Sequence, residues 1–143
     1  KQEWISWFIE NLSNKDLTPI QKEDRQYQFY NFGRHEVPFD SEILEYVKKV
    51  VGMDDITYDC YHTHVWNEGD FFDTHIDNRF GRIFSFVCEL QQSDCKTKLL
   101  VEDQKVDEGW FDVHTRHQVP MIQKGQRISL TIFGKNKIKR VLI

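Results

Sequence analysis

The stretch Arg127-Ile128-Ser129-Leu130-Thr131-Ile132-Phe133 alternates between polar and apolar side chains. Successive residues of a β-strand point to opposite faces, so a strand here presents Arg127 and Ser129 on one face and aliphatic side chains on the other. We expect a layer of helices to bury the aliphatic face. The stretch therefore predicts a sheet with one covered face and one face free for polar chemistry.

Two segments nearer the start of the chain predict the helices of that layer. Residues 4–12 carry apolar side chains three and four positions apart, which is the spacing of one helical stripe. A second helix is predicted to begin at a capping residue, Asp40 or Ser41, and to end at Gly52. The polar residues 14–24, which include a proline, predict a loop.

The remaining apolar segments are short and are separated by turn residues such as Lys124-Gly125, so they predict strands. Besides residues 127–133, the predicted strands cover residues 26–32, 56–66, 71–77, 82–90, 98–101 and 109–114. Early helices followed by many short strands predict an α+β, mainly β fold, with the N-terminal helices packed on one sheet. At this length we expect a double-stranded β-helix, or jelly roll.

The composition fits a single domain over residues 1–143. Apolar residues make up 39% and aromatic residues 14% of the chain, which argues against a disordered chain. Lys plus Arg number 19 and Asp plus Glu number 23, so the net charge is 19 − 23 = −4. This balance disfavours a strongly basic nucleic-acid binder, without excluding chemistry on a nucleobase.

The cysteines indicate a cellular compartment. Cys60, Cys88 and Cys95 are too few and too scattered to form a disulfide framework, so we expect the cytoplasm or another reducing compartment. No apolar run approaches the roughly 20 residues that span a bilayer, and we expect no membrane partner. The sequence starts at Lys1 rather than Met, so it leaves open whether a signal peptide has been removed.

His75-Ile76-Asp77 places an imidazole and a carboxylate two residues apart, and therefore on one face of a strand. Both groups are natural ligands of Fe(II), Zn or Mn. The pair alone is a weak signal, because an ordinary His and Asp at a strand end would look the same. A metal site needs a third ligand from elsewhere in the chain.

His117 is our candidate for that ligand. Suppose that residues 117–130 form a hairpin whose turn centres near residue 122. The residue numbers of two paired positions then add up to about 244, so His117 pairs with Arg127, and both lie on the face that carries Ser129. An Arg fork and a hydroxyl suit a carboxylate ligand beside the His, although a structural salt bridge of Arg127 fits the same pattern. His114 has the opposite strand parity, so we favour His117.

Taken together, His75-x-Asp77, His117 and Arg127-x-Ser129 resemble the motif of the Fe(II)/2-oxoglutarate-dependent oxygenase superfamily. The resemblance implies that His75, Asp77 and His117 form a facial metal triad for Fe(II), and that Arg127, assisted by Ser129, binds the distal carboxylate of 2-oxoglutarate. It implies hydroxylation of a substrate C–H bond by O2, with release of succinate and CO2. Ascorbate is a further cofactor candidate.

The resemblance covers residues 58–133 and is strongest to the small prolyl-4-hydroxylase-type domains. The lead-in from Trp66 to His75 is similar to that family, although Trp66 stands where its pattern often has Tyr. The stretch from Arg127 to Thr131 also resembles nucleic-acid demethylases, but Phe133 stands where those tend to carry a second Arg.

Other side chains near the motif are candidates for binding. A Tyr hydroxyl often binds the co-substrate in this family, and only one of Tyr58 and Tyr61 should face inward, because they lie three residues apart. The substrate candidates are His64, Trp66, Asn78 and Arg82, with His62 and Arg79 beside them. Ordinary solvated side chains would fit the polar positions equally well. A basic cluster near the end suits an acidic partner or plain surface: Lys135, Lys137, Lys139 and Arg140.

We therefore expect an Fe(II)- and 2-oxoglutarate-dependent dioxygenase that hydroxylates a protein or peptide side chain, in the manner of a prolyl hydroxylase. One alternative keeps the chemistry and changes the substrate to a nucleobase or small molecule, as in an oxygenase or demethylase. Another is a non-catalytic jelly-roll module that binds metal. Nucleic acid is the less favoured partner.

Overall fold

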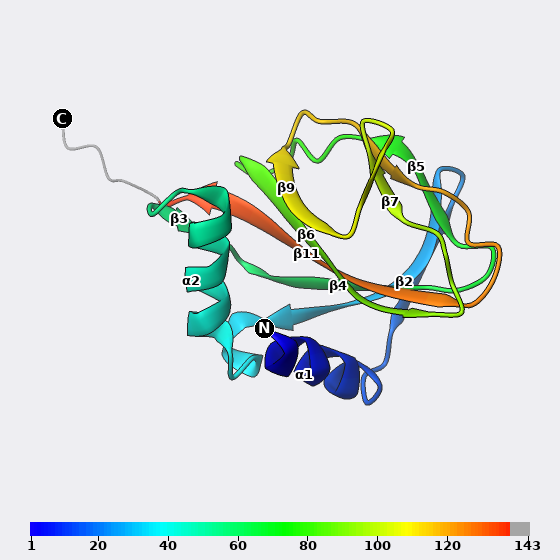
Figure 1. Ribbon diagram of the computed structural model, residues 1–143, viewed down its shortest axis with the longest axis horizontal. Helices are drawn as coiled ribbons and strands as arrows, with labels where there is room; N and C mark the ends of the chain where they lie inside the picture. Colours follow the sequence, from blue (N-terminus) through cyan, green and yellow to red (C-terminus); the bar gives the residue numbers. More distant parts are fainter. Residues whose placement is uncertain (138–143) are drawn as a thin grey trace.

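Two helices lie on one outer side of the strands (Figure 1). The computed structural model describes residues 1–137. Helices α1 (Gln2–Leu12) and α2 (Asp40–Val51) fall where the apolar spacing predicts helices. Gly52 ends α2 in the left-handed conformation, with φ of 76°, which a residue without a Cβ adopts at little cost.

The strands form two antiparallel layers that are joined at one side. Their bounds are β1 (Thr18–Lys22), β2 (Arg25–Gly33), β3 (Ile56–Thr57), β4 (Cys60–Trp66), β5 (Phe71–His75), β6 (Phe84–Ser93), β7 (Leu99–Val101), β8 (Gln104–Val106), β9 (Glu108–Asp112), β10 (His117–Val119) and β11 (Gln126–Asn136). The major sheet runs β1-β2-β4-β11-β6-β9, and the minor sheet runs β8-β7-β10-β5. Strand β5 also pairs with β2 and so links the sheets. This arrangement confirms the predicted mainly β jelly roll.

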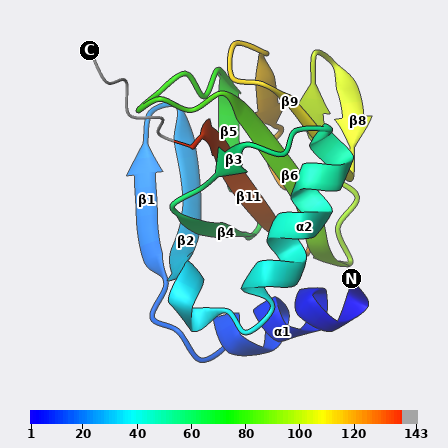
Figure 2. The same cartoon turned by 90° about the vertical axis from the view of Figure 1, so that its left-hand side faces the viewer.

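The major sheet buries its outer face under the helices, as the alternation of β11 predicts. Ile128, Leu130 and Ile132 of β11 lie in one core cluster with Trp4 and Phe8 of α1. Figure 2, a quarter turn from Figure 1, shows α2 in front of these strands. The opposite face of the major sheet is turned toward the minor sheet, and the space between the sheets holds the candidate site.

The start of α2 differs from the prediction. Phe39 occupies the cap position and offers no side-chain hydrogen bond. Asp40 is the first helical residue, and its carboxylate forms an ion pair with Arg34, with 2.9 Å between Nε and Oδ1. Arg34 begins the short 3-10 helix η1 (Arg34–Glu36), in which the Glu36 carboxylate accepts hydrogen bonds from a backbone N–H and a tyrosine hydroxyl.

Some strands have no clear signal in the sequence. The predicted loop at 14–24 contains β1, an edge strand whose side chains are mostly exposed and therefore show no apolar alternation. The predicted strand 56–66 is broken into β3 and β4 at residues 58–59. Strands β8 and β10 are each three residues long, too short for a periodic pattern.

The predicted hairpin between His117 and Arg127 is wrong. Strand β10 pairs with β5 and β7, whereas β11 pairs with β4 and β6, so the two residues come from different sheets. The connection crosses between the sheets, and Ile122 anchors it by exchanging backbone hydrogen bonds with residues 69 and 70. His117 and Arg127 still face the same interior, but from opposite walls.

The three cysteines are free thiols, and none is exposed. Among residues 1–137, neither helix has the length and apolar run that crossing a bilayer requires. The compartment stays a prediction.

Candidate active site

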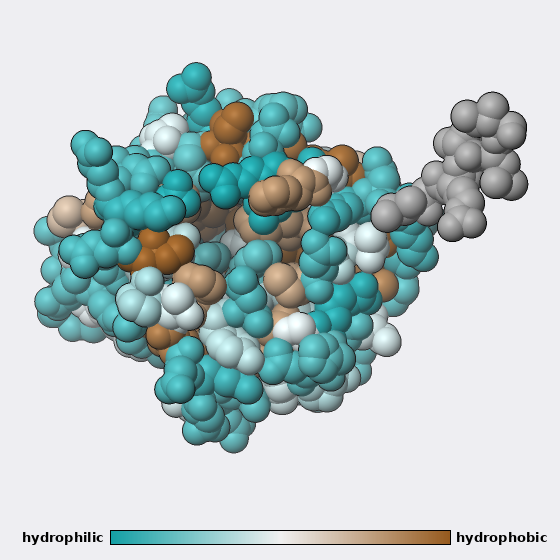
Figure 3. All heavy atoms as spheres, turned by 180° about the vertical axis from the view of Figure 1, so that it is seen from behind, coloured by the Kyte–Doolittle hydropathy of each residue, from teal (hydrophilic) through white to brown (hydrophobic). Residues whose placement is uncertain are grey.

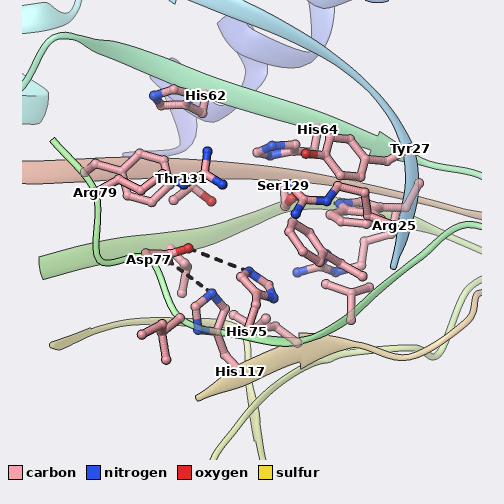
Figure 4. A pocket seen from close by; sticks show the side chains of 18 of the residues that line it. Arg25, Tyr27, His62, His64, His75, Asp77, Arg79, His117, Ser129 and Thr131 are labelled. Carbon is pink, nitrogen blue, oxygen red and sulfur yellow. Dashed lines mark hydrogen bonds and ion pairs between the residues drawn. The ribbon is translucent and has the colours of Figure 1, made fainter. Parts of the chain in front are cut away.

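The interior between the sheets brings His75, Asp77 and His117 together (Figure 4). His75 is the last residue of β5, and His117, the first residue of β10, is its partner in the pairing of these strands. The Nε2 atom of His117 lies 3.1 Å from Oδ2 of Asp77, and Nε2 of His75 lies 3.6 Å from Oδ1. The ligand atoms of all three residues lie within 4.8 Å of one another.

The hydrogen bonds around these residues fit a metal ion. Nδ1 of His75 lies 2.7 Å from the carbonyl oxygen of Asp73, and Nδ1 of His117 lies 3.0 Å from that of Thr115. A carbonyl oxygen can only accept, so each Nδ1 carries a hydrogen, and each neutral ring keeps its lone pair on Nε2. Both Nε2 atoms face Asp77. Such outer hydrogen bonds orient metal-binding imidazoles, and two imidazoles with one carboxylate suit Fe(II).

The charges of His75 and Asp77 also fit a metal ion. Burial and the neighbouring His117 lower the pKa of His75. Burial acts to raise the pKa of Asp77, but the neighbouring His117 and a hydrogen bond from the Ser85 hydroxyl, 2.7 Å away, outweigh it and lower the pKa. A neutral imidazole and an ionised carboxylate are the forms that bind a metal, because a proton competes for the same lone pairs.

The alternative ligand His114 lies elsewhere. It is exposed in the turn after β9, where its backbone N–H donates to the Asp112 carboxylate. The structure brings His117, and not His114, to His75 and Asp77, but neither the predicted hairpin nor a strand shared by the two histidines is present, because His114 lies in a turn.

The opposite wall of the interior carries Arg127 and Ser129. Strand β11 pairs with β4, which sets Arg127 opposite Trp66 and Ser129 opposite His64. The indole N–H of Trp66 donates to Oγ of Ser129 over 3.0 Å, so the Ser129 hydroxyl hydrogen is free for another acceptor. Through this hydrogen bond Trp66 orients the Ser129 side chain.

Arg127 is 4% exposed and has only one carboxylate partner among residues 1–137. Its Nε lies 3.4 Å from Oε1 of Glu89, and neither of these two buried atoms has a hydrogen bond. The other carboxylate oxygen of Glu89, Oε2, forms an ion pair with Nζ of Lys98 at 2.9 Å. The outer guanidinium nitrogens of Arg127 therefore remain free to bind a carboxylate in the interior.

One pocket of about 230 Å³ connects the two walls. It is lined by His75, Asp77 and His117 from one side and by Arg127, Ser129, Trp66, His62 and His64 from the other. Seen from behind, the molecule is hollowed, with apolar side chains inside a largely hydrophilic surround (Figure 3). The pocket also includes residues that sequence reasoning missed: Arg25, Tyr27, Phe72, Ile76, Val87, Leu99, Val119, Thr131 and Phe133.

The structure corrects the expectation for Tyr58 and Tyr61. Both are buried in the core under the helices, and neither lines the pocket. Their hydroxyl oxygens lie 2.9 Å apart, and Tyr61 donates to Asp40. They share a side because residue 59 interrupts the strand between β3 and β4, which breaks the parity rule.

The substrate candidates fall into two groups. His62 and His64 line the pocket, and burial lowers their pKa to about 4 and about 3, so both are neutral at neutral pH. Arg82 also lines the pocket, with Arg79 beside it. Asn78 is exposed and lies outside the pocket lining, because the chain turns outward directly after Asp77.

The two residues of the basic cluster that the structure describes, Lys135 and Lys137, do not line the pocket. Lys135 forms an ion pair with Asp59, with 2.7 Å between the charged atoms, and Lys137 is exposed. Lys139 and Arg140 lie outside the described residues.

A scan of protein-family models and a search of curated protein sequences found no match to this sequence. Solved structures do match. A Pseudomonas putida prolyl-4-hydroxylase superposes with a TM-score of 0.73 at 16% identity, over 96% of this chain and 89% of that one. A viral collagen prolyl hydroxylase from Paramecium Bursaria Chlorella virus-1, in complex with 2-oxoglutarate, superposes with a TM-score of 0.68 at 13% identity. The match covers 96% of this chain and 92% of that one.

A prolyl hydroxylase from Trichoplax adhaerens, in complex with a peptide fragment of the oxygen degradation domain of hypoxia inducible factor, gives a TM-score of 0.65 at 16% identity. It covers 94% of this chain and 78% of that one. A 2OG-Fe(II) oxygenase family member from Burkholderia pseudomallei superposes with a TM-score of 0.67. The chain therefore has the prolyl-hydroxylase-like jelly-roll fold of the 2OG-Fe(II) oxygenases.

Proposed function

We propose that this protein is an Fe(II)- and 2-oxoglutarate-dependent dioxygenase that hydroxylates a C–H bond of a protein or peptide side chain. One observation carries the proposal. A single pocket has His75, Asp77 and His117 converging on one wall and the buried, incompletely paired Arg127 on the other. A metal site alone would not need that arginine.

His75, Asp77 and His117 would hold Fe(II). Bound Fe(II) supplies the O2 chemistry that couples conversion of 2-oxoglutarate to succinate and CO2 with hydroxylation. The protein keeps the ligands ready: carbonyl groups fix the imidazole hydrogens on Nδ1, and Ser85 orients Asp77. These contacts hold three ligands on one side and leave the other side to the pocket.

Arg127 would bind the distal carboxylate of 2-oxoglutarate through its outer nitrogens, and the Ser129 hydroxyl would donate a further hydrogen bond. Glu89 balances part of the Arg127 charge from the Nε side. The neutral His64 adds no competing cation at neutral pH. Burial strengthens the charge-assisted bonds, because little water remains to screen them.

The substrate class is supported by two observations. A protein with a similar fold, from Trichoplax adhaerens, is a prolyl hydroxylase in complex with a peptide fragment. The net charge of −4 disfavours a long polyanion. A peptide is therefore our first choice, and a nucleobase or a small molecule is the alternative within the same chemistry.

Aerobic turnover tests the proposal. Protein loaded with Fe(II) is incubated with 2-oxoglutarate, ascorbate and a panel of proline-containing peptides, and both succinate and a one-oxygen mass gain on the peptide are measured. We expect both products with the unchanged protein and with His114→Ala, and neither with His117→Ala. Absence of succinate from protein shown to hold iron would contradict the proposal and favour the non-catalytic metal-binding module.

A further inference from the structure

The pocket opens beside the loop between β5 and β6, and the side chains there form a distinct surface. We define the pocket mouth as Ile76, Arg79, Phe80, Arg82 and Phe133. Four of these line the pocket, and Phe80 lies against Arg82. A turn holds the two arginines together, because the backbone N–H of Arg82 donates to the carbonyl of Arg79.

Arg82 is held in place by aromatic rings. Its guanidinium carbon lies 3.6 Å from the centre of the Phe133 ring and 6.0 Å from that of Phe80. A guanidinium stacked on a ring keeps its N–H edges free for a ligand in its own plane. The stacking therefore orders a donor fork and occupies none of its donors.

The arginines of the pocket mouth have no carboxylate partner within the described residues. No carboxylate oxygen of residues 1–137 lies at ion-pair distance from Arg79 or Arg82. Arg25, Arg34 and Arg127 each have one. Arg82 is half-buried, and a half-buried cation without a partner is unfavourable, whereas the neighbouring Arg79 is exposed. A ligand carboxylate would remove the cost at Arg82 and could accept further hydrogen bonds from Arg79.

The loop also holds apolar side chains in solvent. Phe80 is 78% exposed and Ile76 is 45% exposed. Phe80 has φ of 50°, a left-handed conformation that a bulky residue adopts only at a cost in energy. An exposed, strained aromatic residue beside two unpaired cations is typical of a binding surface rather than of a plain turn. It extends the contact area beyond the pocket itself.

We infer that the pocket mouth binds an acidic side chain of the substrate, so that the enzyme selects a peptide with Asp or Glu close to the hydroxylated residue and an apolar residue next to it. This deepens the proposed function and rests on it. A nucleic acid fits less well, because affinity for nucleic acid depends on Lys and Arg side chains that neutralise several phosphates. The pocket mouth offers two unpaired arginines on a chain with a net charge of −4.

A displayed library of random peptides around a fixed proline tests the inference. The library is panned on protein loaded with Mn(II) and 2-oxoglutarate, so that binding is read without turnover. We expect Asp and Glu to be enriched on the unchanged protein. With Arg79→Glu and Arg82→Glu combined, we expect this preference to be lost and Lys or Arg to be enriched instead.

Arg116→Glu is the matched control. Arg116 is exposed and lies outside the pocket lining, so this charge reversal should leave the preference for acidic residues unchanged. The best acidic peptide should bind the double variant roughly tenfold more weakly or worse in a direct titration. No acidic enrichment on the unchanged protein, or the same enrichment on the double variant, overturns the inference.

Two further readouts separate this inference from the proposed function. Binding of 2-oxoglutarate to the Fe(II)-loaded double variant should match that of the unchanged protein, which shows that the variant is folded and its inner site intact. Acidic enrichment without hydroxylation would support the inference and contradict the proposed function, whereas hydroxylation without acidic enrichment would do the reverse. Stronger, steeply salt-dependent binding of a single-stranded oligonucleotide through the same arginines would also overturn it.

Discussion

Replacing Tyr61 by Phe is expected to weaken the fold and to leave 2-oxoglutarate binding unchanged. The Tyr61 side chain is fully buried, and its hydroxyl donates to Asp40 and lies 2.9 Å from the Tyr58 hydroxyl oxygen. Burial, and then the neighbouring Tyr58 and Asp40, raise the pKa of Tyr61, so its hydroxyl stays protonated and acts as a donor. Phe fits the same space and removes only that group.

The expected cost follows from the partners left behind. Without the Tyr61 hydroxyl, the buried Tyr58 hydroxyl loses its hydrogen-bond partner, and Asp40 keeps only Arg34. A buried polar group left unpaired costs about 1–3 kcal/mol. For a domain of this size that corresponds to a fall in Tm of about 3–9 °C.

The assay is urea unfolding, followed by tryptophan fluorescence, together with an anaerobic titration of the Fe(II)-loaded protein with 2-oxoglutarate. Tyr46→Phe is the matched control, because the Tyr46 hydroxyl donates to Glu108 near the surface, where water can replace it. It should cost less than Tyr61→Phe. A tenfold loss of 2-oxoglutarate affinity in Tyr61→Phe, with an unchanged unfolding midpoint, would refute this assignment and return Tyr61 to the co-substrate site.

Three further changes probe the site and the fold. Trp66→Phe removes the indole N–H that donates to Ser129. One neutral hydrogen bond contributes about 0.5–1.5 kcal/mol, so we expect a titration to show that 2-oxoglutarate binds about 2–10-fold more weakly. An unchanged affinity would contradict a role of Ser129 in binding 2-oxoglutarate. His117→Ala is expected to abolish binding of one Fe(II) per chain, measured by metal analysis after anaerobic desalting, whereas His114→Ala is expected to retain it. A hydrogen bond from a backbone N–H lowers the pKa of Glu36, so its contribution to stability is present above the ordinary carboxyl pKa and is lost as pH falls through the lowered value. Glu36→Gln should therefore be less stable than the unchanged protein at neutral pH, and the difference in urea midpoint should shrink with acidification; a difference that stays constant would contradict the role of that charge.

Structural features that depend on residues close together in the chain could be predicted from local sequence patterns. Alternation along β11 predicted both its apolar face under the helices and its polar face toward the pocket. The two-residue spacing of His75 and Asp77 predicted that they lie on one side, and strand parity favoured His117 over His114. The period of a strand explains the two faces of β11, and the sequence displays it directly. Asp77 lies past the end of β5 and His114 lies in the turn after β9, so the strand period does not by itself place these two residues.

Pairing between distant strands could not be predicted in the same way. The expected hairpin assumed that neighbouring segments pair, but the jelly roll sends β10 to β5 and β11 to β4 and β6. Glu89, Ser85 and Tyr27 gave no signal, because ordinary strand residues become site residues only through such pairing. The break at residue 59 misled the prediction for Tyr58 and Tyr61, since a parity rule fails wherever a strand is interrupted.

The measurement that tests the central claim most directly is an anaerobic titration of the Fe(II)-loaded protein with 2-oxoglutarate, following the visible charge-transfer band of the chelate. We predict a saturable band in the unchanged protein, its loss in His75→Ala, and a clear shift to higher 2-oxoglutarate concentration in Arg127→Ala. Absence of the band from protein that has bound iron would contradict the account, because the His75, Asp77 and His117 wall and the Arg127 wall would then not form one co-substrate site.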